Sequence, residues 1–220
     1  DLHLSYAPVY RNVAVHVKKG PMVVEYMDRL IEVFLKQKNE CSRVFAVMVS
    51  LYFPNDWPES QRVAKDYYSQ FMDSLNAQIR HFNECKKRVG QSRNPKVRFC
   101  RVIEDGQKPL NNSGIVRGLH IHAVLFFNGH QFNNLGDFES GQLNLALRIK
   151  KAWATALDLC PAEVNYNGLV HFSTQTHPIN DTHCSAGDKM KTMFTHFSYI
   201  CKAYSKRYDL GIKPFSSSRG

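Results

Sequence analysis

Two histidines separated by one apolar residue, His120 and His122, stand inside the strongly apolar stretch 118–127. Side chains on a β-strand alternate between its two faces, so both imidazoles would point to the same side. Paired imidazoles bind transition metals, and they accept Mg²⁺ or Mn²⁺ when a carboxylate completes the ligand set. The spacing therefore predicts one half of a metal site. The alternative is a structural pair whose rings are satisfied across the sheet, because buried polar rings need partners.

A carboxylate at the end of the preceding strand-like run could complete this site. Glu104 and Asp105 both stand there, and a hairpin would bring their strand to about 5 Å from the histidine strand. We predict Glu104 as the third ligand and keep Asp105 as its competitor, because a strand register cannot be read from one sequence. A His-His-Glu set leaves coordination positions open for phosphate oxygens, which a bound ion would polarise.

A phenol and an ammonium lie one helical turn apart in Tyr199-Ile200-Cys201-Lys202. A tyrosine oxygen that attacks phosphorus forms a covalent phosphotyrosine, which conserves the energy of the broken phosphodiester. Because the pKa of a phenol is about 10, a nearby metal or cation must favour the phenolate or offset charge on the phosphate. Lys202 is placed to offset that charge. Tyr204 and Tyr208 are alternative nucleophiles, and packing is the alternative role for any of the three tyrosines.

The other histidines fit known histidine motifs less well. The run His171-Phe172-Ser173 resembles one half of a two-histidine phosphoesterase motif, but a second His-x-Ser or His-x-Thr is absent. A nucleotide hydrolase of the histidine-triad type needs a third alternating histidine, where this chain has Val124. We expect His177, His183 and His196 to be surface or helix-end residues.

The composition favours a nucleic-acid partner. The chain has a formal charge of +10 and a pI near 9.4, and a polyanion is the simplest partner for such an excess. The alternative is a solvated surface that aids solubility. No apolar stretch reaches membrane-spanning length, so we expect no membrane contact. The six cysteines show no CxxC pair, which predicts reduced thiols in a cytoplasmic protein. No targeting segment is visible, although the chain opens on Asp1.

The hydrophobic periodicity predicts an α+β fold. Helices are predicted over Met22–Lys38, Glu59–Lys87, Gly141–Leu159 and Ser185–Lys206, and strands over Arg43–Phe53, Lys96–Ile103, Leu119–Phe127 and Gly168–Thr174. After an N-terminal leader and helix in residues 1–40, the order is β-α-β-β-α-β followed by a helix. This is the ferredoxin-like, split βαβ order, which predicts a central antiparallel sheet with helices on one face. We expect residues 41–220 to form one compact domain, in which 211–215 is a loop.

Three patterns, taken in order, resemble the motifs of the HUH endonucleases. They are a strand of the Val44–Phe53 kind, His120-Ile121-His122 and Tyr199-Ile200-Cys201-Lys202. Three further runs are similar to the inovirus-type replication proteins of filamentous phages and prophage elements, namely Ser198–Lys202, Ser205-Lys206 and Pro214–Arg219. The resemblance covers about residues 43–219, and its specificity lies in the order and spacing of the motifs. It departs from the family at Ser216, near which family members often have glycine.

The resemblance implies a rolling-circle replication initiator that nicks one DNA strand at an origin with Mg²⁺ or Mn²⁺. Such enzymes stay linked to the 5′ phosphate, leave a 3′ hydroxyl and later rejoin the ends. His120 and His122 match the metal ligands, Glu104 the acidic ligand, Tyr199 the nucleophile and Lys202 the motif lysine. Two-tyrosine relatives would use a second tyrosine, but Tyr204, five residues on, does not share the helical position of Tyr199, so we predict one nucleophile.

The implied partners are single-stranded or hairpin DNA at a replication origin, together with the helicase and polymerase of the host, in whose cytoplasm the protein would act. We expect five basic residues to contact the DNA backbone, namely Lys206, Arg207, Arg98, Arg101 and Arg219. A relaxase or transposase of the same superfamily is one alternative. A non-catalytic nucleic-acid binding module is another, because fold does not fix function; it predicts aromatic residues where this chain has His120 and His122.

Overall fold

The computed structural model describes residues 2–16, 20–54, 61–91, 93–110, 114–138, 142–204, 206, 208 and 213–219, with only the backbone at 61–62, 107–110 and 114–117. The elements in chain order are β1 (Leu4–Ser5), β2 (Val9–Tyr10), β3 (Val13–Ala14), β4 (Met22–Val23), α1 (Val24–Glu40), β5 (Arg43–Tyr52), α2 (Gln61–Lys87), β6 (Arg98–Leu110), β7 (Gly114–Asn128), α3 (Leu145–Leu157), α4 (Pro161–Tyr166), β8 (Val170–Asn180), α5 (Ala186–Phe197), the 3₁₀ helix η2 (Ser198–Cys201) and β9 (Phe215–Ser217). Among the described residues, no helix is long and apolar enough to cross a membrane. All six cysteines are free thiols.

The main sheet has five antiparallel strands in the order β8-β5-β7-β6-β9. The predicted α+β class and the β-α-β-β-α-β order of the middle of the chain are confirmed. Two short elements in the second half of the chain, β9 and α4, were not predicted. Phe215 was predicted to belong to a loop and instead begins β9, which pairs with β6, while 211–212 lie outside the described residues. The predicted helix ended at Leu159, and a further helix, α4, starts at Pro161, because a proline is well suited to the first turn of a helix.

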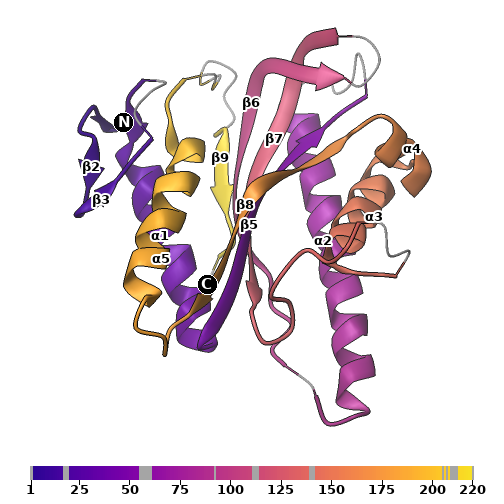
Figure 1. Ribbon diagram of the computed structural model, residues 1–220. Coiled ribbons are helices and arrows are strands. Elements are labelled where there is room, and N and C mark those ends of the chain that lie inside the picture. Colours follow the sequence, from indigo (N-terminus) through magenta and orange to yellow (C-terminus); the bar gives the residue numbers. More distant parts are fainter. Residues whose placement is uncertain are drawn as a thin grey trace.

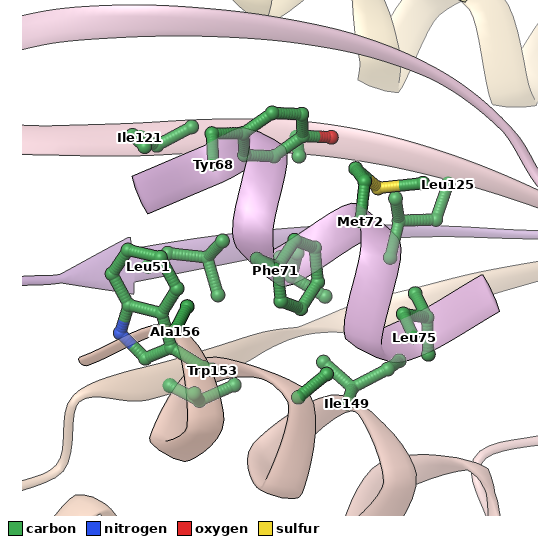
Figure 2. Close-up of a cluster of buried hydrophobic side chains, with 14 of the residues drawn as sticks. Leu51, Tyr68, Phe71, Met72, Leu75, Ile121, Leu125, Ile149, Trp153 and Ala156 are labelled. Carbon is green, nitrogen blue, oxygen red and sulfur yellow. The ribbon is translucent and has the colours of Figure 1, made fainter. Parts of the chain in front are cut away.

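Helices cover both faces of this sheet, so the prediction of helices on one face is wrong. Figure 1 shows α1 and α5 on one side of the sheet and α2 and α3 on the other. The central strand β5 explains the difference, because nine of its ten residues are buried or half-buried in succession, as expected for a strand with both faces covered. Figure 2 shows the core on the α2 side, where Phe71 of α2 lies near Leu51 of β5 and its ring centroid is 6.0 Å from that of Trp153 of α3.

The N-terminal residues belong to the same body as the sheet. The predicted leader forms two small antiparallel pairs, β1 with β4 and β2 with β3. Helix α1 then packs its buried face, including Leu30 and Phe34, against the sheet residues Val124 and Phe126 and against α5. In the described part of the chain, α1 and the sheet therefore share one core.

The last helix is shorter than predicted. The apolar pattern predicted Ser185–Lys206, but α5 ends at Phe197, η2 continues it to Cys201, and Lys202 has an extended backbone with φ −58° and ψ 143°. Tertiary hydrogen bonds replace the helical ones at this point. Lys202 forms a β-bridge with Met22, and the backbone N–H of Ala203 donates to the carbonyl of Pro21 at 2.8 Å. The N-terminal segment thus ends the helix.

Two histidines predicted to lie on the surface or at helix ends form a bonded pair. His177 of β8 is 7% exposed, and its Nε2 lies 2.9 Å from Nδ1 of His196 on α5. Burial lowers the pKa of His177 to about 4 and also lowers the pKa of His196. The prediction of a surface position is therefore wrong for His177.

This pair predicts loss of stability in mild acid. The unfolded chain takes up a proton on each histidine near pH 6.5, whereas folded His177 does so only near pH 4, so the free energy of unfolding falls as the pH drops through this window. We expect a loss of about 2 kcal/mol for His177 between pH 7.5 and pH 5, measured by urea denaturation. His177→Phe should flatten the pH dependence, and the exposed control His183→Ala should not. An equal change of the free energy of unfolding with pH in the two variants would contradict this account.

Candidate active site

The structure brings together the three predicted metal ligands. Glu104 on β6 and His120 on β7 are directly opposite each other, and His122 follows two residues along the same face. One ligand atom from each of the three side chains lies within 4.8 Å of the other two. All three are buried, with exposures of 2%, 5% and 8% in the order named. Asp105 is not in this cluster, because the next residue along a strand points to the opposite face.

Hydrogen bonds fix the orientation of both imidazoles. Nδ1 of His122 lies 2.8 Å from Oγ of Ser50, its partner residue on β5, and Nδ1 of His120 donates to the carbonyl of Gly118 at 3.3 Å. The two Nε2 atoms are thereby directed toward each other at 3.2 Å. In metal-binding histidines, the ring nitrogen that does not bind the metal typically makes a hydrogen bond of this kind. Ser50 was not predicted as a site residue, although a hydroxyl inside an apolar strand was a signal for it.

The protonation state of the cluster suits a metal ligand set. Burial, assisted by the positive charge of His120 when protonated, lowers the pKa of His122 to about 3, against the opposing effect of Glu104. His122 is therefore neutral at physiological pH, and a neutral imidazole is the form that binds a metal. Two imidazole nitrogens and one carboxylate are a suitable donor set for Mn²⁺ or Mg²⁺ when phosphate or water supplies further oxygens.

Two lysines hold the carboxylate of the cluster. Nζ of Lys202 lies 3.2 Å from one oxygen of Glu104, and Nζ of Lys206 lies 3.2 Å from the other. Lys206 also donates to the carbonyl of Lys202. Burial lowers the pKa of Lys206 to about 8 although Glu104 opposes this effect. Two ammonium groups around one carboxylate give the site an excess of positive charge, which favours an anionic ligand.

Tyr199 lies beside the metal-ligand cluster. Its ring centroid is 5.5 Å from that of His122 at an interplanar angle of 87°, and Nζ of Lys202 lies 3.6 Å from the centroid of the Tyr199 ring. Tyr199 is half-buried in η2, whereas Tyr204 is 64% exposed and Tyr208 is 42% exposed. The two parts of the chemistry predicted from sequence, nearly eighty residues apart, therefore meet in space.

The basic residues that were predicted to contact DNA differ in how exposed their side chains are. Arg98 and Arg101 are 2% and 3% exposed: Arg98 bonds Glu40 on α1 at 2.9 Å, and Arg101 donates to the carbonyl of Pro214 at 3.0 Å. Both side chains are buried and bonded within the fold, which argues against their predicted contact with a DNA backbone. Arg219 is exposed, and Arg207 lies outside the described residues. Lys206, which is 8% exposed, reaches the metal-ligand cluster and not the outer surface.

The fold and the site define an α+β protein in which a buried Glu-His-His cluster lies against a tyrosine. This chain belongs to the family described as the YagK/YfjJ C-terminal domain, whose model matches residues 7–218. It is similar to two proteins of Escherichia coli (strain K12). The uncharacterized protein YagK is 25% identical over 207 residues, which cover 91% of this chain and 95% of the relative. The uncharacterized protein YfjJ is 26% identical over 216 residues, which cover 91% and 97%. No solved structure matches this chain.

Proposed function

We propose that this protein is a metal-dependent single-strand DNA endonuclease and strand transferase of the HUH type. It would nick a replication origin through a covalent 5′-phosphotyrosine, rejoin the ends afterwards and so initiate rolling-circle replication. One observation carries the proposal: the ring of Tyr199 packs edge-on against His122, a member of the Glu104, His120 and His122 cluster. A nucleophile and a set of metal ligands in contact are what phosphodiester transfer through tyrosine requires.

The strand order supports this proposal. In the order β8-β5-β7-β6, the two strands of each β-α-β unit are separated by one intervening strand, which is the ferredoxin-like arrangement. The central strands β5 and β7 carry Ser50 and the two histidines, and β6 supplies Glu104. The topology therefore puts the ligand-bearing strands next to one another and the tyrosine on η2, which continues the helix that follows β8.

The residues of the chain have distinct roles in the proposed reaction. The phenolic oxygen of Tyr199 attacks phosphorus and loses its proton to solvent, and the bond from phosphorus to the 3′ oxygen breaks. The 3′ oxygen takes up a proton and leaves as a hydroxyl. Lys202, next to the Tyr199 ring, offsets negative charge on the phosphate. A divalent ion held by the three ligands would polarise the scissile phosphate when bound. In the rejoining step the 3′ hydroxyl attacks the phosphotyrosine and releases Tyr199.

The covered sheet argues against the non-catalytic module. A ferredoxin-like RNA-binding domain stacks bases on aromatic side chains of an open sheet face. Here α1 and α5 cover the face that carries His120 and His122, and α2 and α3 cover the other (Figure 1). A relaxase or transposase would use the same site and the same chemistry, and the origin or transfer sequence that is cleaved would distinguish these roles. A cytoplasmic, DNA-bound protein of a phage or prophage element fits each of them.

A covalent-adduct assay tests the proposal. The protein is incubated with Mn²⁺ and a library of single-stranded and hairpin oligonucleotides labelled at either end, and is then denatured in detergent. We expect a denaturation-resistant adduct that carries the 3′-end label, release of the 5′-end label with a free 3′ hydroxyl, and no adduct in EDTA. Binding without an adduct in Mg²⁺, Mn²⁺ or any other divalent ion would refute the nickase and favour the binding module.

A further inference from the structure

The N-terminal segment, residues 2–16 and 20–23, holds the element that carries Tyr199 from both sides. Before the tyrosine, the backbone N–H of His16 donates to Oγ of Ser198 at 2.8 Å, and Oγ1 of Thr195 donates to the carbonyl of Ala14 at 2.9 Å. After the tyrosine, the bridge from Met22 to Lys202 and the hydrogen bond between Pro21 and Ala203 fasten the chain again. This segment therefore fixes the backbone on either side of Tyr199.

One side chain of the same segment contacts the tyrosine ring. The imidazole of His16 lies edge-on to Tyr199, with ring centroids 5.8 Å apart and an interplanar angle of 88°. His122 makes a contact of the same kind at 5.5 Å and 87°. The phenol thus lies against one imidazole from the metal-ligand cluster and another from the N-terminal segment, while Lys202 lies over its ring. Nδ1 of His16 is buried and forms no hydrogen bond with any residue that the structure describes.

These contacts restrict the rotamer of Tyr199. A tyrosine side chain has three staggered χ1 wells, and a change of well moves the ring from its observed place beside His122 and His16. Tyr199 is the second of four residues in η2, and its ring contacts His122 of β7 and His16 of the N-terminal segment. The edge-on contact with His16 selects the observed well, because aromatic rings favour this geometry. Small misplacements of a reacting group lower rates by up to about 10²-fold.

We propose that His16 is a positioning residue for Tyr199, and that the N-terminal segment holds this tyrosine in place in the active site. The catalytic consequence rests on the proposed function, in which Tyr199 is the nucleophile. The structural part does not, because it concerns only where the phenol ring is held. The role needs the shape and edge of the His16 ring and not its protonation.

Three variants and two measurements test this inference. His16→Ala removes the ring, His16→Phe keeps an aromatic edge without a titratable nitrogen, and His3→Ala is the control, since His3 is an exposed histidine of the same segment whose Nδ1 bonds Glu25. The first measurement is the single-turnover rate of adduct formation at saturating oligonucleotide. The second is the NMR signal of Tyr199 in protein labelled with ¹³Cζ-tyrosine, assigned with Tyr199→Phe, which does not depend on activity.

We expect His16→Ala to slow adduct formation about tenfold without changing the oligonucleotide concentration at half-saturation, and to shift the Tyr199 signal. His16→Phe should restore most of the rate and leave its pH profile unchanged, and His3→Ala should match the wild type. The inference is overturned if His16→Ala behaves like His3→Ala, or if His16→Phe is as slow as His16→Ala, which would indicate proton transfer. A wild type without any adduct would refute the proposed function, and the NMR signal would still decide the positioning role.

Discussion

Replacement of Tyr199 by phenylalanine is expected to abolish the covalent protein–DNA adduct and to lower strand cleavage by at least about 10³-fold. The substitution removes one oxygen atom and keeps the ring, so the edge-on contacts with His122 and His16 are retained. A loss of this size would therefore report chemistry at the phenol and not a disturbed fold. Denaturing gels with 3′-labelled oligonucleotide measure the adduct, and oligonucleotide binding should stay within about twofold of the wild type.

Tyr204 provides the matched control for this result. It is a phenol five residues away whose side chain is 64% exposed, and Tyr204→Phe should form the adduct at the wild-type rate. An adduct that survives in Tyr199→Phe and disappears in Tyr204→Phe would transfer the role of nucleophile to Tyr204. Survival in both single variants and loss in the double variant would indicate a two-tyrosine enzyme, which contradicts the single nucleophile that we predict.

The meeting of Glu104, His120 and His122 was predictable because its determinants are local. The alternation of side chains along a strand depends only on backbone geometry, so the same-side placement of His120 and His122 follows from their spacing. The choice of Glu104 over Asp105 needed the hairpin register, and two strands close in sequence restrict that register strongly. In the structure Glu104 is the residue opposite His120, as a hairpin between these two strands allows.

The burial of Arg98 and Arg101 was not predicted, because a charged side chain is exposed only on average. Arg98 and Arg101 stand on β6, a strand enclosed by α1 on one side and α2 on the other, and their burial depends on partners distant in sequence, such as Glu40 and Pro214. Long basic side chains are rarely buried without a partner, and no local pattern marks which ones will find one. Lys206 is a similar case, since its partner Glu104 is about a hundred residues earlier in the chain.

The contribution of the N-terminal segment was also out of reach of the sequence. Strands of two residues, such as β2 and β3, are too short to show a hydrophobic period. This region was therefore predicted to be a leader without strands. Its effect on the chain near Lys202 is a tertiary one, because the bridge to Met22 ends a helix that the apolar pattern would have continued. Hydrophobic periodicity shows which side of a helix or strand is buried. It does not show which distant segment will form hydrogen bonds with the backbone of that helix or strand.

The substitution Glu104→Gln is expected to lower both metal affinity and stability. It keeps the shape of the side chain and removes its charge, so one of three ligands is weakened and two buried ammonium groups lose their counter-charge. We expect Mn²⁺ affinity, measured by EPR titration, to fall at least about 100-fold. In EDTA, where no metal contributes, we expect the free energy of unfolding to fall by about 3 kcal/mol, because breaking a buried ion pair leaves an uncompensated charge.

A surface glutamate and a double variant separate these two effects. Glu32 forms exposed ion pairs with Arg29 and Lys36 on α1, and Glu32→Gln should change stability by less than about 1 kcal/mol. Adding Lys206→Met to Glu104→Gln removes one of the two buried ammonium groups that have lost their counter-charge. The double variant should therefore recover a substantial part of the lost stability in urea denaturation. It should recover none of the lost Mn²⁺ affinity. Equal losses of stability in Glu104→Gln and Glu32→Gln would show that the lysines do not depend on Glu104. Unchanged Mn²⁺ affinity in Glu104→Gln would remove the carboxylate from the ligand set and leave the two histidines without their third partner.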